Sequence, residues 1–124
     1  MCFGQALRIL IVDDQERIGR SVRSLLQTQL NWVVCGEAST GRQGVKQAME
    51  LHPDVILVDI TMPEMDGLAA TRQITAEDPG SHVIILTHHE SESVTNEAFR
   101  AGARSYVLKS RPQDIVPAIQ AICS

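Results

Sequence analysis

The stretch Val55-Ile56-Leu57-Val58-Asp59 places four consecutive apolar residues directly before an aspartate, and it decides the fold class. An uninterrupted apolar run rich in β-branched residues is typical of a strand buried on both faces, as in a parallel sheet. Two further runs have the same character, ILIV ending at Val12 and VIIL ending at Leu86. Because none of the three alternates with polar residues, they indicate a parallel sheet that is covered by helices on both faces.

Strand-like and helix-like segments alternate along the whole chain. The expected strands are Leu7–Val12, Trp32–Cys35, Val55–Val58, Val83–Leu86 and Tyr106–Leu108. Each is followed by apolar residues at helical spacing, such as Ile18, Val22 and Leu25 after the first strand. Five βα units in 124 residues predict one α/β domain with an open, doubly wound sheet. Pro117 falls inside the last expected helix, where we expect it to remove a hydrogen bond and kink the helix.

Composition excludes several classes of protein. The chain has 11 basic and 15 acidic side chains, a net charge of −4 that argues against nucleic-acid binding by this domain. Its three cysteines form no C-x-x-C pair, so we expect reduced thiols. No apolar run reaches the roughly 18 residues of a membrane helix, and the N-terminus does not resemble a signal peptide. These features predict a cytoplasmic domain that does not bind membranes.

Polar side chains follow four of the five expected strands. Asp13 and Asp14 follow the first strand, Asp59 the third, Thr87 the fourth and Lys109 the fifth. In a doubly wound sheet of order 2-1-3-4-5, the first and third strands are neighbours at the switch point, where ligands bind beyond the carboxyl ends. We therefore expect the three carboxylates to converge in one crevice.

Three carboxylates in one crevice repel one another, so one becomes protonated or a cation neutralises them. Oxygen ligands in a sparse site that leaves room for water and phosphate oxygens favour Mg²⁺ over Ca²⁺. Lys109 adds a positive charge and Thr87 a hydroxyl donor. Since a carboxylate also acts as a nucleophile that forms an acyl phosphate, the residues predict a Mg²⁺-dependent phosphoryl-transfer site. The alternative interpretation is a set of helix N-caps and loop carboxylates.

At these spacings the sequence resembles the receiver domains of two-component response regulators, over about Leu7 to Ile122. The motifs are Val12-Asp13-Asp14, the D-x-x-M-P-x-M-D-G stretch from Asp59 to Gly67, Leu86-Thr87, and the segment Gly102 to Lys109. The segment Tyr106–Ile119 is similar to the NarL/LuxR-type branch. The resemblance implies a flavodoxin-like, CheY-like (βα)5 fold of order 2-1-3-4-5. We expect residues 1–124 to be a receiver domain from a longer regulator with a C-terminal helix-turn-helix output domain.

The resemblance also assigns roles at the acidic site. It implies that Asp59 is the phosphoacceptor and that Asp14 and Asp59 ligate Mg²⁺ by their side chains. The backbone carbonyl of Thr61 is an implied further ligand, and Asp13 acts through a metal-bound water. Lys109 is expected to pair with Asp59 and then with the phosphoryl group.

A switch is implied by the same resemblance. Thr87 hydrogen-bonds the phosphoryl group and shifts toward it, and Tyr106 follows by changing rotamer. This alters the face formed by the fourth helix, the fifth strand and the fifth helix. The implied partners are a sensor histidine kinase, a second copy of the chain on phosphorylation, and DNA through the output domain alone. The chain is then a signalling module in the control of transcription, with self-phosphotransfer and autodephosphorylation, and not an enzyme acting on a metabolite.

Two residues depart from the family pattern. Ser110 follows Lys109 where the family often has a proline after a cis peptide bond. A non-proline cis bond costs about 3–4 kcal/mol, so we predict a trans bond here. His88 follows Thr87 at a position that is usually small in the family, and we expect it to narrow access to Asp59 or to hydrogen-bond the phosphoryl group.

Three other functions compete with this interpretation. A haloacid dehalogenase-type phosphatase needs D-x-D-x-T/V after the first strand, and Asp13-Asp14-Gln15-Glu16 does not fit. A flavin or dinucleotide binder lacks its glycine-rich loop at that place. The remaining alternative is a stand-alone or phosphorylation-independent receiver that acts by protein–protein interaction, which the intact set of site residues disfavours.

Overall fold

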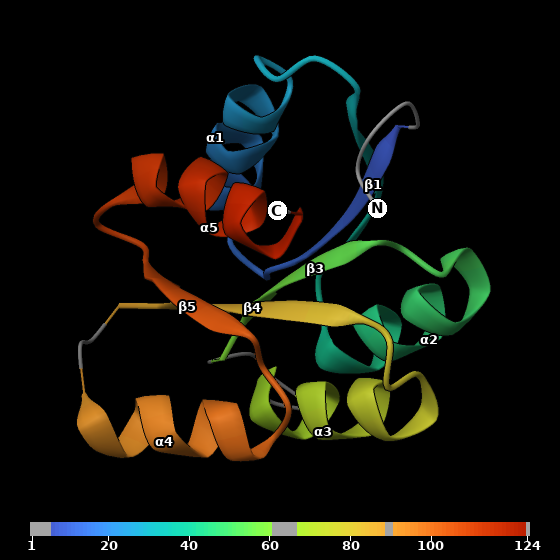
Figure 1. Cartoon of the computed structure of the whole chain (residues 1–124), viewed down its shortest axis with the longest axis vertical. Coiled ribbons are helices and arrows are strands. Elements are labelled where there is room, and N and C mark those ends of the chain that lie inside the picture. The colour runs from blue at the N-terminus through green and yellow to red at the C-terminus, as the bar shows by residue number, and fades with distance from the viewer. Residues whose placement is uncertain (1–5, 61–66, 89–90, 124) are drawn as a thin grey trace.

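The structure is a computed structural model of the whole chain and describes residues 6–60, 67–88 and 91–123 (Figure 1). Strands and helices alternate along this part of the chain. In order they are β1 (Leu7–Val12), α1 (Glu16–Leu26), β2 (Trp32–Ala38), α2 (Gly41–Leu51), β3 (Val55–Asp59), α3 (Gly67–Glu77), β4 (His82–Thr87), α4 (Glu92–Arg100), β5 (Ser105–Leu108), the 3-10 turn η1 (Pro112–Asp114) and α5 (Ile115–Cys123).

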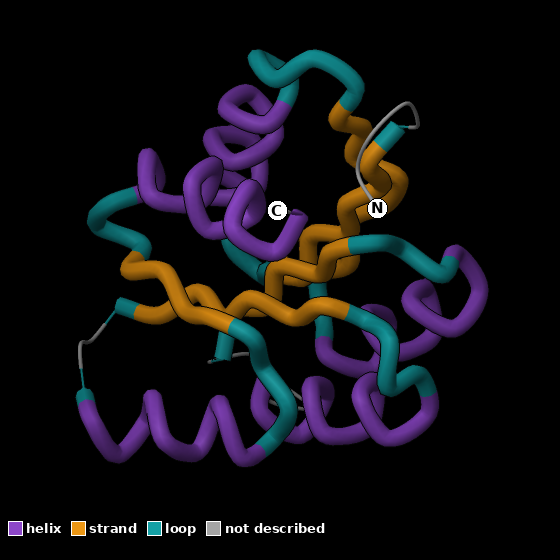
Figure 2. The backbone as a smooth tube through the Cα atoms, in the orientation of Figure 1, coloured by secondary structure: helices purple, strands orange, loops and turns teal. Residues whose placement is uncertain are grey.

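The strands form one parallel sheet in the order β2-β1-β3-β4-β5. Helices α1 and α5 cover one face of the sheet, and α2, α3 and α4 cover the other (Figures 1 and 2). This confirms the predicted fold class and strand order. The chain leaves β1 toward β2 and returns to β3 on the other side of β1, so the switch point lies between β1 and β3.

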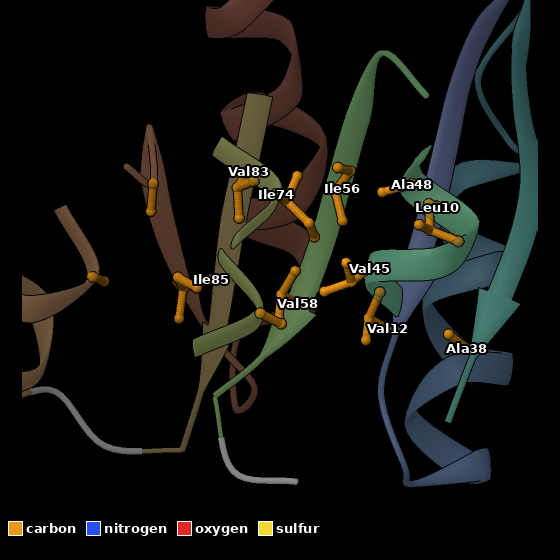
Figure 3. Packing of buried hydrophobic residues seen from close by; sticks show 13 residues of the cluster. Leu10, Val12, Ala38, Val45, Ala48, Ile56, Val58, Ile74, Val83 and Ile85 are labelled. Carbon is orange, nitrogen blue, oxygen red and sulfur yellow. The ribbon is translucent and has the colours of Figure 1, made fainter. Parts of the chain in front are cut away.

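β3 is buried on both faces, which explains its uninterrupted apolar sequence. Ile56 and Val58 pack in the layer beneath α2, α3 and α4, while Val55 and Leu57 pack in the layer beneath α1 and α5. Figure 3 shows Ile56 and Val58 in the first of these layers. Burying each such side chain contributes about 1.5–3 kcal/mol. The two layers together fix the direction of β3, and therefore the position of Asp59 at its end.

β2 runs further than the sequence indicated, to Ala38 instead of Cys35. The pairing with β1 shifts between Ile9 and Leu10, and beyond this irregularity Ile11 lies opposite Glu37. The strand is at the edge of the sheet and half exposed, so its second half lacks the apolar run on which the expectation was based. The extension brings Glu37 to the carboxyl edge of the sheet.

The Cys35 thiol is free, and burial raises its pKa, although the charge of Arg8 opposes this rise.

The expected loss of a helix hydrogen bond at Pro117 does not arise. The α-helix begins only at Ile115, after the 3-10 turn, so Pro117 lies in its first turn. The N–H groups of a first turn have no acceptor inside the helix, and a proline there removes nothing. Among the described residues no peptide bond is cis, which confirms the trans bond predicted between Lys109 and Ser110.

Candidate functional site

The predicted carboxylates meet at the carboxyl edge of the sheet, where β1 and β3 end side by side. Val12 lies opposite Val58 in the register, so the residues after them emerge together. Ligand oxygens of Asp13, Asp14 and Asp59 all lie within 4.8 Å of one another. Asp59 is 1% exposed and Asp13 is 8% exposed, whereas Asp14 faces solvent. The arrangement is a crevice with two buried carboxylates and one open to ligands from outside.

Lys109 supplies the positive charge expected at this edge. Its backbone N–H donates to the carbonyl oxygen of Thr87 at 2.7 Å, which places the residue beside the end of β4. Its ammonium Nζ lies 2.9 Å from Asp59 Oδ2 and 3.1 Å from Asp13 Oδ2. All three side chains are at most 2% exposed, so little water screens these ion pairs. One ammonium thus balances part of the charge of three carboxylates.

Burial raises the pKa of Asp13 above its ordinary value of 3.8. The Gln15 backbone N–H, which donates to Asp13 Oδ1 at 2.7 Å, opposes this rise, as does the charge of Lys109. The negative charge of Asp59 adds to the rise. Asp13 Oδ2 is buried and accepts no hydrogen bond from the described residues, because the contact with Lys109 has the distance of an ion pair without hydrogen-bond geometry.

These residues fit a hard divalent cation such as Mg²⁺. The donor set consists of carboxylate oxygens, which such ions prefer. The buried Asp13 oxygen without a hydrogen-bond donor and the incomplete charge balance both favour a further positive charge in the crevice. The predicted ligand Thr61 lies outside the described residues.

The residues expected in the switch occupy the end of β4 and the middle of β5. Thr87 is buried at 4% exposure, at the same edge as the carboxylates. Tyr106 lies opposite Ile85 and is half-buried against the layer beneath α2, α3 and α4. His88 directly follows Thr87 and is exposed. The structure therefore places Thr87 and His88 at the site edge and Tyr106 further back along β5.

Two features of the site were missed by the sequence analysis. Gln15 Oε1 accepts a hydrogen bond from Lys109 Nζ at 3.2 Å, a contact between distant residues that no motif announces. Gly67, at the start of α3, approaches β3 so closely that a Cβ there would lie 2.0 Å from the Asp59 carbonyl oxygen. The glycine at the end of the D-x-x-M-P-x-M-D-G stretch was the available signal for this second feature.

A cleft of about 450 Å³ opens beside the carboxylates, between α1 and the end of β2. Its lining includes Asp14, Arg20, Glu37 and Gln43. Glu37 also forms an ion pair with Arg23 of α1. The cleft gives molecules from solvent a path to the exposed carboxylate.

Among the described helices, none has the length and apolar character that spanning a membrane requires.

Comparison with known proteins identifies relatives over almost the whole chain. The model of the response regulator receiver domain matches residues 9–120. The transcriptional regulatory protein LiaR of Bacillus subtilis is 41% identical over 116 residues, which are 93% of this chain and 55% of LiaR. The chemotaxis protein CheY of Thermotoga maritima is 34% identical over 93% of this chain and 96% of its own length. The chain thus spans about half the length of LiaR and nearly all of this CheY.

Solved structures agree with these sequence matches. A LuxR-family two-component response regulator from Aurantimonas sp. SI85-9A1 superimposes with a TM-score of 0.90 at 34% identity. The match covers 95% of this chain and 85% of that one. The response regulator domain of Thermotoga maritima CheB superimposes with a TM-score of 0.88 at 27% identity, over 94% of this chain and 96% of that one.

Proposed function

Because this chain belongs to the response regulator receiver domain family, we propose that Asp59 accepts a phosphoryl group from a sensor histidine kinase. Receiver domains are signalling modules of two-component systems, and this one is close to LuxR-type regulators. The observation that carries the assignment is the contact of 2.9 Å between Asp59 Oδ2 and Lys109 Nζ, inside a cluster of three carboxylates.

Of the three carboxylates, Asp59 is the best phosphoacceptor, because Asp13 and Asp14 are bonded or placed differently. Asp13 holds the Gln15 backbone N–H through Oδ1, and Asp14 is exposed at the mouth of the crevice. In the transfer, a bond forms between an Asp59 oxygen and phosphorus while the bond from phosphorus to the donor atom breaks. Lys109 keeps its ammonium beside Asp59 and balances the negative charge that arrives with the phosphoryl group.

Asp14 and Asp59 hold Mg²⁺ by their carboxylates in this proposal, with the Thr61 carbonyl as a further ligand and Asp13 acting through a bound water. The ion, when bound, neutralises charge on the phosphoryl oxygens. Support comes from the oxygen-only donor set and from the buried Asp13 oxygen that lacks a hydrogen-bond donor in the described residues.

Phosphorylation then acts on Thr87, which donates its hydroxyl to the phosphoryl group and moves toward it. Tyr106 changes rotamer in response and alters the face formed by α4, β5 and α5. The hydrogen bond from the Lys109 N–H to the Thr87 carbonyl links the ends of β4 and β5 and supports this coupling. A switch of this kind needs to change the free-energy difference between two conformations by only a few kcal/mol. His88, exposed next to Thr87, modulates access to Asp59.

We further propose that the whole protein is a cytoplasmic transcription regulator. LiaR, a transcriptional regulatory protein, is about twice as long as the matched segment. Residues 1–124 are then the receiver domain, followed by a helix-turn-helix output domain that contacts DNA. Phosphorylation would drive homodimerisation of the receiver. The phosphorylation-independent alternative is not favoured, because Asp13, Asp14, Asp59, Thr87 and Lys109 are all present at one edge of the sheet.

Intact mass spectrometry tests the phosphoacceptor directly. Wild-type protein and the Asp59→Asn variant are incubated with acetyl phosphate and Mg²⁺, and each mass is compared with that of untreated protein. The wild type is expected to gain one phosphoryl group that hydroxylamine removes, as it does from acyl phosphates, and the variant is expected to gain none. Absence of modification on the wild type with acetyl phosphate and with phosphoramidate would favour the phosphorylation-independent receiver.

A further inference from the structure

The Lys109 ammonium is surrounded by three oxygen acceptors, one of which lies outside the acidic cluster. Nζ lies 2.9 Å from Asp59 Oδ2 and 3.1 Å from Asp13 Oδ2. The third oxygen is Oε1 of Gln15, at 3.2 Å. A lysine ammonium has three N–H donors and no acceptor, so it can donate to the amide oxygen of Gln15 while its charge is paired with the two carboxylates. Only the oxygen atom of the amide can face an ammonium, because the amide nitrogen is itself a donor.

Gln15 is held in place by its backbone. Its N–H donates to Asp13 Oδ1 at 2.7 Å, and its carbonyl oxygen accepts from the Gly19 N–H at 3.0 Å. The residue is the N-cap of α1, yet its side chain makes no capping hydrogen bond to the helix. The side chain reaches instead to Lys109, 94 positions away in sequence. Backbone hydrogen bonds therefore fix both residues of the contact, Gln15 as described here and Lys109 through its N–H to the Thr87 carbonyl.

We propose that Gln15 is a positioning residue for phosphoryl transfer, which acts by holding the ammonium of Lys109 against Asp59. The inference rests on the proposed function, because Lys109 matters here through its contact with the phosphoacceptor. Of the three acceptors, Asp59 changes chemically when it is phosphorylated, while Gln15 and Asp13 do not. A neutral amide also holds the ammonium without adding a fourth negative charge to the crevice.

The test combines a spectroscopic signature of Lys109 with a rate. Gln15→Met keeps the length of the side chain and removes the oxygen, and Gln15→Glu restores an oxygen at the same reach. Gln27→Met is the matched control, because Gln27 is an exposed glutamine at the other end of α1. NMR of 15N-labelled protein without Mg²⁺ follows proton exchange of the Lys109 ammonium, and mass spectrometry follows the initial rate of phosphorylation by acetyl phosphate with Mg²⁺.

In Gln15→Met we expect faster exchange of the ammonium protons and a phosphorylation rate lower by about 3- to 10-fold, the effect of losing one hydrogen bond of ordinary net strength. Gln15→Glu is expected to restore slow ammonium exchange, and Gln27→Met to match the wild type in both measurements. An unchanged rate in Gln15→Met overturns the proposal, even with altered exchange, and so does an equal loss in Gln27→Met. Failure of the proposed function looks different, because the wild type itself would then remain unphosphorylated.

Discussion

Lys109 Nζ lies 2.9 Å from Asp59 Oδ2, and this ion pair joins the ends of two strands, β5 and β3, that are separated in the sheet by β4. The contact is possible because the Lys109 backbone is bonded to Thr87 at the end of β4, from where the long side chain reaches across to β3. Both side chains are 2% exposed, so the pair is shielded from water, and removing either member would leave the buried charge of the other less well balanced. The charge balance of the crevice therefore depends on few groups.

In the absence of metal, removing one carboxylate should stabilise the protein. The same change should reduce the stabilisation that Mg²⁺ provides. In buffer with EDTA, Asp14→Asn is expected to raise the free energy of unfolding by less than about 1 kcal/mol, because Asp14 is exposed and its repulsion is screened. Mg²⁺ at about 100 times its dissociation constant should add about 2.7 kcal/mol to the wild type and less to the variant. Urea unfolding measures both, and an equal gain from Mg²⁺ would contradict the assignment of Asp14 as a ligand.

A side chain at Gly67 should displace the end of β3. A Cβ there would lie 2.0 Å from the Asp59 carbonyl oxygen and 2.5 Å from Ile60 Cα, and backbone atoms at such distances must move. Gly67→Ala is expected to lower the free energy of unfolding by about 3 kcal/mol or more and to slow phosphorylation of Asp59. In the control Gly80→Ala, the added Cβ would lie 3.6 Å from Asp78 Oδ1, which is an ordinary van der Waals contact. That control should stay within about 0.5 kcal/mol of the wild type in urea unfolding.

His82 should make stability fall as the pH drops below neutrality. Burial lowers its pKa below the ordinary value of 6.5, and the charge of Arg104 lowers it further, against the opposite effect of Asp54. The unfolded chain therefore binds more protons at and below pH 6.5, so stability that is present above this value is lost as the pH falls toward the lower pKa of the folded state.

The His82 contribution can be isolated by substitution. His82→Gln, which does not titrate, should lose less free energy of unfolding between pH 7.5 and pH 5.5 than the wild type, with all values taken from urea unfolding in EDTA. Identical pH dependence in the two proteins would show that this imidazole is not the cause.

His88 should slow the reactions at Asp59. It is exposed and directly follows Thr87, so its imidazole lies at the edge where a phosphodonor or water approaches. His88→Ala is expected to be phosphorylated faster by acetyl phosphate and to lose the phosphoryl group faster, since a bulky side chain is removed. His52→Asn, at an exposed histidine beyond α2, should leave both rates unchanged. Equal rates for His88→Ala and the wild type would rule out a role of His88 in access.

Sequence reasoning succeeded where a pattern is local and burial is complete. The apolar run before Asp59 predicted β3 because both faces of that strand are covered. The same reasoning ended β2 too early, at Cys35, because an edge strand is half exposed and carries no continuous apolar run. It expected Pro117 to disturb a helix interior, because the sequence does not show that a 3-10 turn precedes α5 and moves the proline into the first turn.

Local patterns in the sequence are enough to predict the number and order of the βα units, the three carboxylates with a lysine and a threonine at strand ends, and the family to which they point. These properties depend on periodicity and on motif spacing, which are local. Two contacts emerge only from the folded chain: the Gln15 amide shares the Lys109 ammonium with Asp59, and Gly67 lies against the backbone at the end of β3. The Gln15–Lys109 contact joins residues 94 positions apart, so it follows from the packing of the sheet and its helices and not from residue spacing. The motif marks Gly67, but how closely this residue approaches β3 depends on the packing of α3.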